Sequence, residues 1–123
     1  MELFRRHFIY IQVLPDHFTG RVLGDKRTIR RACPSLDNRR DEIKDFSHIR
    51  HTLKAIFKEL SPGFSLRRPV ALMHFVPSHY VPTQVEVVNF KKSAERAGVS
   101  FCCISKWEAP HTDRELELIW TRL

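Results

Sequence analysis

Cysteine and glycine are scarce in this sequence. The 123 residues include only three cysteines and four glycines. An odd number of cysteines, two of them the neighbours Cys102 and Cys103, does not form a disulfide framework, so we expect a reducing compartment, the cytoplasm. With so little glycine and only seven prolines, the chain is neither collagen-like nor of low complexity.

Long apolar runs are absent as well. The longest, Phe8–Val13 and Val70–Pro77, are each interrupted by a polar residue, whereas a membrane-spanning helix needs about 18 apolar residues. The first seven residues contain no signal-peptide core, so export is not expected. The segment Leu3–Arg6 is amphipathic but short, so its membrane affinity is marginal and no stable membrane insertion is expected.

The chain does have enough apolar residues for a core, and it has an excess of positive charge. Apolar residues make up 42% of the sequence, and 21 Lys and Arg against 14 Asp and Glu give a net charge of +7. We therefore predict one globular domain over residues 1–123 with an anionic partner. The candidate contacts to an anion or a nucleic acid are Lys26, Arg27, Arg30, Arg31, Arg67 and Arg68. Charge alone predicts weak, non-specific binding, and a solvated basic surface is the alternative.

The first third of the chain is predicted to be an antiparallel meander. The segments 7–13, 18–23 and 27–33 are rich in β-forming residues, and only short turns separate them. The second or third strand is expected at a sheet edge. Such an edge, together with Trp120 and Leu123, is a candidate docking surface for a protein partner or a second copy of the chain.

The rest of the chain is predicted to alternate helices and strands. Ser47 is expected to cap a helix that runs to Leu60, because apolar residues recur there with a period of 3.6. Capping boxes beginning at Thr83 and Thr112 open two further helices, which are expected to run to Gly98 and to Trp120. The segments 69–76 and 99–105 read as strands joined through helices, and such strands pair in parallel. The predicted fold is α/β, one mixed five-stranded sheet in the order β-β-β-α-β-α-β-α.

This element order resembles the ribonuclease-H-like fold and each half of the actin and sugar-kinase superfamily. Short motifs narrow the resemblance to the N-terminal half of the rod-shape-determining actin-like MreB family, over about residues 41–105. They are Asp45-Phe46 before a helix, Arg67-Arg68-Pro69-Val70, Val76-Pro77-Ser78 and Ala94-Glu95-Arg96-Ala97-Gly98. Length and element order also resemble a small enterobacterial stress-protein family, the YjaA-like proteins.

The sequence lacks the features that bind nucleotide or metal ions in these families. The turn equivalent to the phosphate-binding Asp-x-Gly-Thr hairpin of actin-like ATPases reads Leu14-Pro15-Asp16-His17 and has no glycine. The second half-domain that closes the nucleotide cleft does not fit in 123 residues. No predicted strand carries an internal carboxylate for the metal ions of ribonuclease-H enzymes. We therefore expect no cofactor and no metal.

Cys33 is the candidate redox thiol, because the nearby Arg30 and Arg31 favour a thiolate. Cys102 and Cys103 point to opposite faces of a strand and are expected to be inert core residues.

Four histidines are of interest. His48 and His51 share a helix face but lack a third ligand, so a solvated face is the preferred interpretation. His74 lies in an apolar strand and is expected to be a core histidine with satisfied hydrogen bonds. Ser78 and His79 follow a turn at the carboxyl edge of the sheet, where open α/β folds bind ligands, and they are the candidate ligand-binding residues.

No hydrolase, P-loop or dinucleotide-binding motif occurs, so no catalytic residue and no enzyme activity are predicted. A triad that the fold assembles from distant residues stays an alternative. The leading hypothesis is a non-enzymatic cytoplasmic protein-interaction or regulatory module, linked to stress. The alternatives are a basic nucleic-acid-binding protein and a thiol-based stress sensor.

Overall fold

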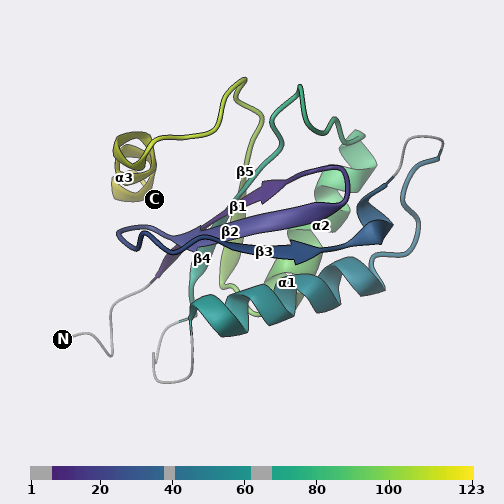
Figure 1. The fold of residues 1–123 in the computed structure, drawn as a ribbon, viewed down its shortest axis with the longest axis horizontal. Helices are drawn as coiled ribbons and strands as arrows, with labels where there is room; N and C mark the ends of the chain where they lie inside the picture. The colour runs from purple at the N-terminus through teal and green to yellow at the C-terminus, as the bar shows by residue number, and fades with distance from the viewer. Residues whose placement is uncertain (1–6, 38–40, 62–67) are drawn as a thin grey trace.

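One mixed sheet organises the chain. The computed structural model describes residues 7–37, 41–61 and 68–123. Its strands are β1 (Phe8–Val13), β2 (His17–Val22), β3 (Ile29–Ala32), β4 (Val70–His74) and β5 (Phe101–Ser105). They lie in the order β3-β2-β1-β4-β5 (Figure 1). The pairs β1–β2 and β2–β3 are antiparallel, and the pairs β1–β4 and β4–β5 are parallel. The predicted α/β class and mixed five-stranded sheet are confirmed.

Three α-helices and a short 3₁₀ turn complete the described fold. They are η2 (Pro34–Leu36), α1 (Ser47–Leu60), α2 (Gln84–Ala97) and α3 (Asp113–Thr121). Both predicted capping boxes are confirmed, since the Thr83 and Thr112 hydroxyls accept from the backbone N–H three residues later and the Glu side chains there return the bond. The cap assigned to Ser47 was wrong. Ser47 is already helical, and its N–H and hydroxyl donate to the Asp45 carboxylate, at 2.9 and 2.7 Å.

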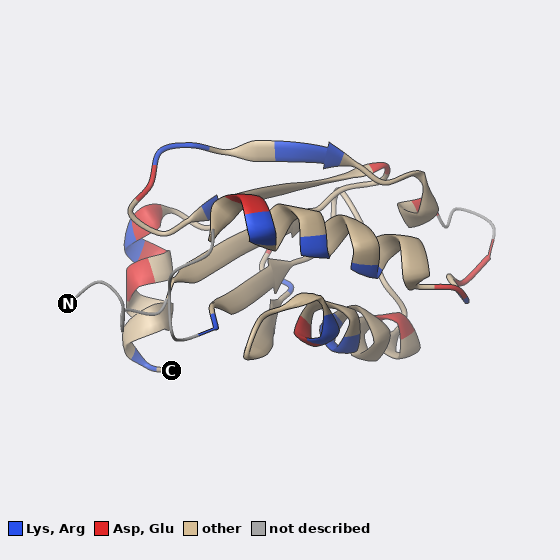
Figure 2. Ribbon diagram, turned by 90° about the horizontal axis from the view of Figure 1, so that it is seen from below, with Lys and Arg blue, Asp and Glu red and all other residues tan. Residues whose placement is uncertain are grey.

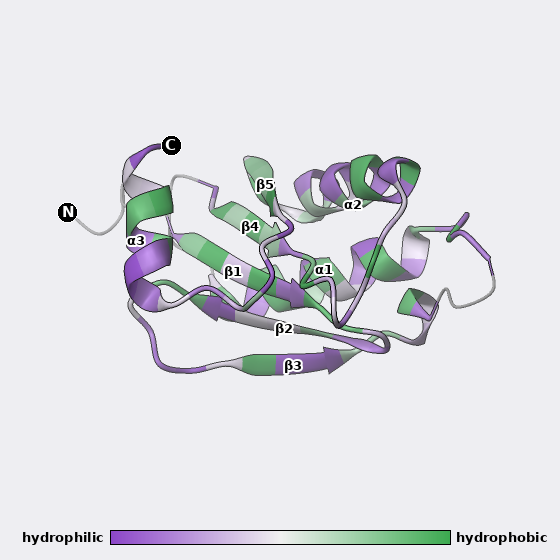
Figure 3. Ribbon diagram, turned by 90° about the horizontal axis from the view of Figure 1, so that it is seen from above, coloured by the Kyte–Doolittle hydropathy of each residue, from purple (hydrophilic) through white to green (hydrophobic). Residues whose placement is uncertain are grey.

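The helices cover the two faces of the sheet unequally. Strand alternation sends Ile9, Ile11 and Val13 into the larger core under α1 and α2, whereas Phe8 and Tyr10 point into the smaller core under α3. In Figure 3 the central strands β1 and β4 carry mostly hydrophobic residues between these layers. The cysteine neighbours divide between the two cores, as predicted from the strand period.

The edges of the sheet correct part of the sequence interpretation. The second or third strand was predicted at a sheet edge. The third strand, β3, is an edge strand, whereas β2 lies inside the sheet and β5 forms the other edge. β3 is also shorter than the predicted segment 27–33. Trp120, predicted to belong to a docking surface, stacks on Phe8 with ring centroids 5.1 Å apart and fixes α3 to the sheet. Of the two predicted docking residues, Leu123 is the one that stays mainly exposed, at 53%. Among the described helices, none has the length and apolar content that crossing a membrane requires. Leu3–Arg6 lie outside the described residues.

Candidate functional site

The basic residues of the third strand are exposed. Lys26, Arg27, Arg30 and Arg31 all face solvent on β3 or just before it. Two of them also tie the strand to the end of α1: Arg27 donates to the main-chain carbonyl of Glu59 at 3.3 Å, and Arg31 pairs with the Glu59 carboxylate at 2.8 Å. This edge is therefore a basic surface that rests on α1.

Helix α1 widens that basic surface. Arg50, Lys54 and Lys58 are exposed at positions i, i+4 and i+8, so they follow one face of the helix (Figure 2). The Arg31–Glu59 pair joins β3 to the last turn of α1. At helical spacing Arg50, Lys54 and Lys58 lie roughly 100° to 180° around α1 from Glu59, so they form a second row of cations. We call these two rows of exposed cations, on β3 and on α1, the basic face.

Arg68 has a structural role instead. Its guanidinium donates to the carbonyls of Glu95 and Gly98, at 3.1 and 3.2 Å. These bonds add to the capping of α2, whose Glu95 carbonyl also accepts from the Gly98 N–H at 3.4 Å. Arg67, the other member of this predicted pair, lies outside the described residues.

Helix α2 presents an exposed apolar stripe that was not predicted. Val81, Val85 and Val88 are 73%, 58% and 50% exposed. Their spacing places Val85 and Val88 on one side of the helix, and Val81 lies in the segment before the helix begins. The exposed Lys92 and Arg96 continue the row of Val85 and Val88 at helical spacing. We call Val85, Val88, Lys92 and Arg96 the α2 stripe. The sequence signal for the stripe was this spacing, whereas the helix was predicted from its capping box alone.

Cys33 does not fit the thiolate expected beside Arg30 and Arg31. The residue is 2% exposed, and burial raises the pKa of its thiol, against the direction that neighbouring cations would give. Burial likewise raises the pKa of Cys103, and that of Cys102 to about 12. Burial therefore disfavours the thiolate expected at Cys33, and neither Arg30 nor Arg31 contributes to the shift in its pKa.

Ser78 and His79 lie in the turn after β4 and are both exposed. The chain leaves β4 and β5 at the same edge of the sheet (Figure 1), so this turn does lie at the predicted carboxyl edge. Across 7–37, 41–61 and 68–123, however, no three His, Cys, Asp or Glu side chains lie where they could hold a metal ion together. The polar contacts at this edge involve other residues.

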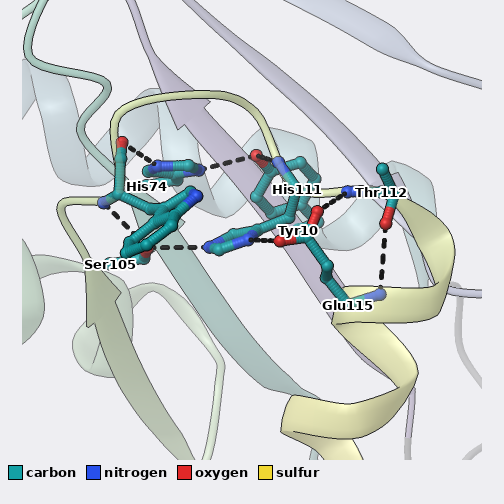
Figure 4. Close-up of polar contacts among 7 residues, drawn as sticks. Tyr10, His74, Ser105, His111, Thr112 and Glu115 are labelled. Carbon is teal, nitrogen blue, oxygen red and sulfur yellow. Dashed lines mark hydrogen bonds and ion pairs between the residues drawn. The ribbon is translucent and has the colours of Figure 1, made fainter.

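Tyr10, His74 and His111 form the centre of that polar cluster (Figure 4). Tyr10 Oη lies 2.7 Å from His74 Nδ1 and accepts from the His111 backbone N–H at 2.9 Å. His74 Nε2 lies 2.9 Å from the carbonyl oxygen of Trp107. A carbonyl only accepts, so His74 carries its proton on Nε2, and its Nδ1 accepts a hydrogen bond from the Tyr10 hydroxyl. The prediction that His74 is a core histidine with satisfied hydrogen bonds is confirmed.

Ser105, His111 and Glu115 continue the cluster toward α3. Ser105 Oγ and His111 Nε2 are 2.8 Å apart, and His111 Nδ1 lies 3.6 Å from a Glu115 carboxylate oxygen. The other Glu115 oxygen accepts from the Thr112 N–H at 2.9 Å, within the capping box of α3. The capping box therefore fixes the carboxylate beside the imidazole.

The protonation preferences of the cluster follow from burial and hydrogen bonds. Burial lowers the pKa of His74, which is fully buried, and raises the pKa of Tyr10. The bonds from Thr112 lower the pKa of Glu115. The Arg21 guanidinium lies 5.6 Å from the Tyr10 ring centroid and pairs with Asp113 at 2.6 Å. At neutral pH the cluster thus holds a neutral His74, a neutral phenol and a carboxylate.

Sequence reasoning missed most of this cluster. Tyr10 and His111 are 101 positions apart, and no local pattern joins them. Two signals were present separately: a histidine inside an apolar strand, and a capping box preceded directly by another histidine. The sheet register brings them together, because it sets Tyr10 on β1 beside Leu72 and His74 on β4 beside Ser105.

Comparison with known proteins assigns no family. No protein-family model, no curated protein and no solved structure matches this chain. The resemblances to the MreB and YjaA-like families therefore stay predictions.

Proposed function

We propose that the chain is a cytoplasmic protein-interaction module whose docking surface is the α2 stripe. The observation that carries this proposal is the exposure of Val85 and Val88 on one side of α2, with the exposed Val81 in the segment just before the helix. Single exposed apolar side chains are ordinary, but a row at helical spacing is typical of a surface that another element covers. The β-β-β-α-β-α-β-α order supports a ribonuclease-H-like or actin-half-like scaffold as part of this proposal.

The partner that fits is an acidic amphipathic segment. The row continues from the valines into Lys92 and Arg96, so an apolar contact would be followed by a positive one. The net charge of +7 also favours an acidic partner. A helix with apolar residues on one side and carboxylates at one end would match both halves of the stripe.

Affinity capture with matched variants tests this proposal. The tagged full chain is expected to retain a partner after nuclease treatment, and a purified acidic partner should bind V85S/V88S at least about tenfold more weakly. The control is L118S, which removes a similarly exposed side chain, 54%, from α3 and should bind normally. The reversal K92E/R96E should also weaken binding, more so at low salt. Equal binding by V85S/V88S and L118S would overturn the proposal.

The basic face favours a second candidate function, nucleic-acid binding. Its cations come from two elements, β3 and α1, and Glu59 is the acidic residue paired among them. An array of this kind contacts phosphates without reading sequence. Fluorescence anisotropy with a short duplex should show affinity that falls steeply with salt, and K54E/K58E should lower the salt slope by about 2. K92E is the control variant, and a salt-independent signal would exclude this function.

A further inference from the structure

The contacts of Ser105, His111 and Glu115 follow the order of a serine nucleophile, a base and an orienting carboxylate. Ser105 Oγ is 2.8 Å from His111 Nε2, and His111 Nδ1 is 3.6 Å from Glu115 Oε2. Among residues 7–37, 41–61 and 68–123, the buried His111 Nδ1 has no hydrogen-bond partner closer than this carboxylate. The second distance exceeds a hydrogen bond, but such contacts are often loose before substrate binds. A role in anchoring α3 does not explain a buried nitrogen directed at a carboxylate.

The hydrogen bonds around Ser105 set the direction of its proton. The Trp107 N–H donates to Ser105 Oγ at 3.3 Å, so the hydroxyl accepts there and its own hydrogen is free to point at His111 Nε2. The Glu115 carboxylate favours the tautomer with the proton on His111 Nδ1. Nε2 is then an acceptor facing the hydroxyl, as a general base must be.

The fold holds all three groups in place. Ser105 is the last residue of β5, where the chain leaves the carboxyl edge of the sheet (Figure 1). The His111 ring stacks on His74 with centroids 4.5 Å apart, and its backbone N–H is held by Tyr10 (Figure 4). Glu115 is held by its capping box. A site supported by a sheet, a stacked ring and a helix cap is preorganised.

We propose that Ser105, His111 and Glu115 form a hydrolytic triad that cleaves small carboxylic esters. Ser105 Oγ attacks the ester carbonyl carbon while its proton passes to His111 Nε2. The carbon–oxygen bond to the alcohol then breaks, and the alcohol leaves with that proton. Water, deprotonated by the same nitrogen, attacks the acyl-serine and releases the carboxylic acid and the free hydroxyl.

The Ser105 hydroxyl is accessible to a small substrate. Ser105 is partly exposed and Trp107 is 62% exposed, so an ester reaches the hydroxyl from solvent. This activity goes beyond the docking surface on α2 and replaces the expectation that the chain has no catalytic residue.

A fluorophosphonate probe tests the nucleophile. The native full chain is expected to form a serine–phosphorus bond at Ser105 with loss of fluoride, located by mass spectrometry of the peptides. S105A should lose the label, and S78A, which removes an exposed serine from the neighbouring turn, should keep it. Labelling that is absent, or that survives heat denaturation or the S105A change, would overturn the proposal.

Hydrolysis of p-nitrophenyl acetate tests the base and the carboxylate. S105A and H111Q should fall to the uncatalysed background, and E115Q should lose at least about tenfold in kcat. E115Q suits this test because glutamine also serves in a capping box, so α3 keeps its cap while the charge is removed. As a positioning residue, Glu115 should also set the pH profile. Without its charge the imidazolium is less stable, so the acidic limb should move to lower pH in E115Q. A lower rate with an unmoved limb would assign Glu115 a structural role and overturn the triad.

Discussion

The two faces of the sheet differ in what they bury. The face under α1 and α2 is covered by two 14-residue helices and packs the larger apolar cluster, and α2 also buries the polar side chains of Glu86 and Ser93. The face under α3 is covered by one nine-residue helix, and its apolar cluster is smaller. Beside that cluster lie the fully buried His74 and the nearly buried Tyr10.

The two faces of the sheet are therefore expected to contribute differently, one mainly to stability and the other mainly to polar chemistry. Burying polar groups costs free energy unless each finds a hydrogen-bond partner. The thin α3 face meets this condition, because hydrogen bonds between Tyr10, His74 and His111 add to the packing of Trp120 on Phe8. Stability should therefore depend most on the α1/α2 face, and pH dependence most on the α3 face.

The largest loss of stability is expected for Phe90→Ala. Phe90 is fully buried and makes edge contacts with Phe46, Phe75 and Tyr80. Its truncation should cost about 3–5 kcal/mol in urea unfolding followed by circular dichroism. Trp120→Ala, on the partly exposed α3 side, should cost less. Equal losses would mean that the two faces contribute alike.

Tyr10→Phe should have the next largest effect. It removes the hydroxyl that serves both His74 Nδ1 and the His111 N–H, so two buried groups lose their partner, at a cost of about 1–3 kcal/mol. Tyr80→Phe is the matched control, since the buried Tyr80 hydroxyl has no hydrogen-bond partner in the part of the chain that the structure describes, and its loss should be neutral or stabilising. Hydrogen exchange of α3 amides should speed up in Tyr10→Phe alone. Similar behaviour of both variants would contradict the role given to the cluster.

The third-largest effect is expected from lowering the pH, which should reduce the stability that the α3 face contributes. Burial holds the pKa of His74 below its ordinary value of 6.5. Between that value and the lower folded-state pKa, the unfolded chain binds more protons, so stability is complete above about pH 6.5 and falls as the pH drops. The depressed carboxylates Asp45 and Glu115, with ordinary values of 3.8 and 4.5, add their losses only at lower pH. His74→Gln should flatten the curve just below about pH 6.5. An unchanged slope would exclude His74 as its source.

The smallest effect is expected on the basic face. Arg31 and Glu59 form an ion pair whose side chains are 47% and 37% exposed. Solvent screens such pairs, so Arg31→Ala should change the free energy of unfolding by no more than about 1 kcal/mol, and added salt should reduce the difference further. A loss as large as that of Tyr10→Phe would show that the β3 edge is structural and not only a binding surface.

Local sequence patterns predicted the elements well and their ends less well. The period of α1 and the two capping boxes depend on residues within a few positions of each other, and these interactions persist in any fold. The ends of the strands and the cap of α1 depend on pairing and on Asp45, and there the predictions were off by one or more residues. Cys33 failed for a related reason, because sequence shows nearby charge but not burial.

The sequence by itself determined the α/β class, the mixed five-stranded sheet and the split of Cys102 and Cys103 between two cores, because each follows from the period of a strand or a helix. Only the tertiary structure decided which polar groups meet. Tyr10, Ser105 and His111 come together through strand register and the docking of α3. A hydrogen bond requires about 3 Å between atoms, and over 101 positions of chain only the packed sheet sets such a distance.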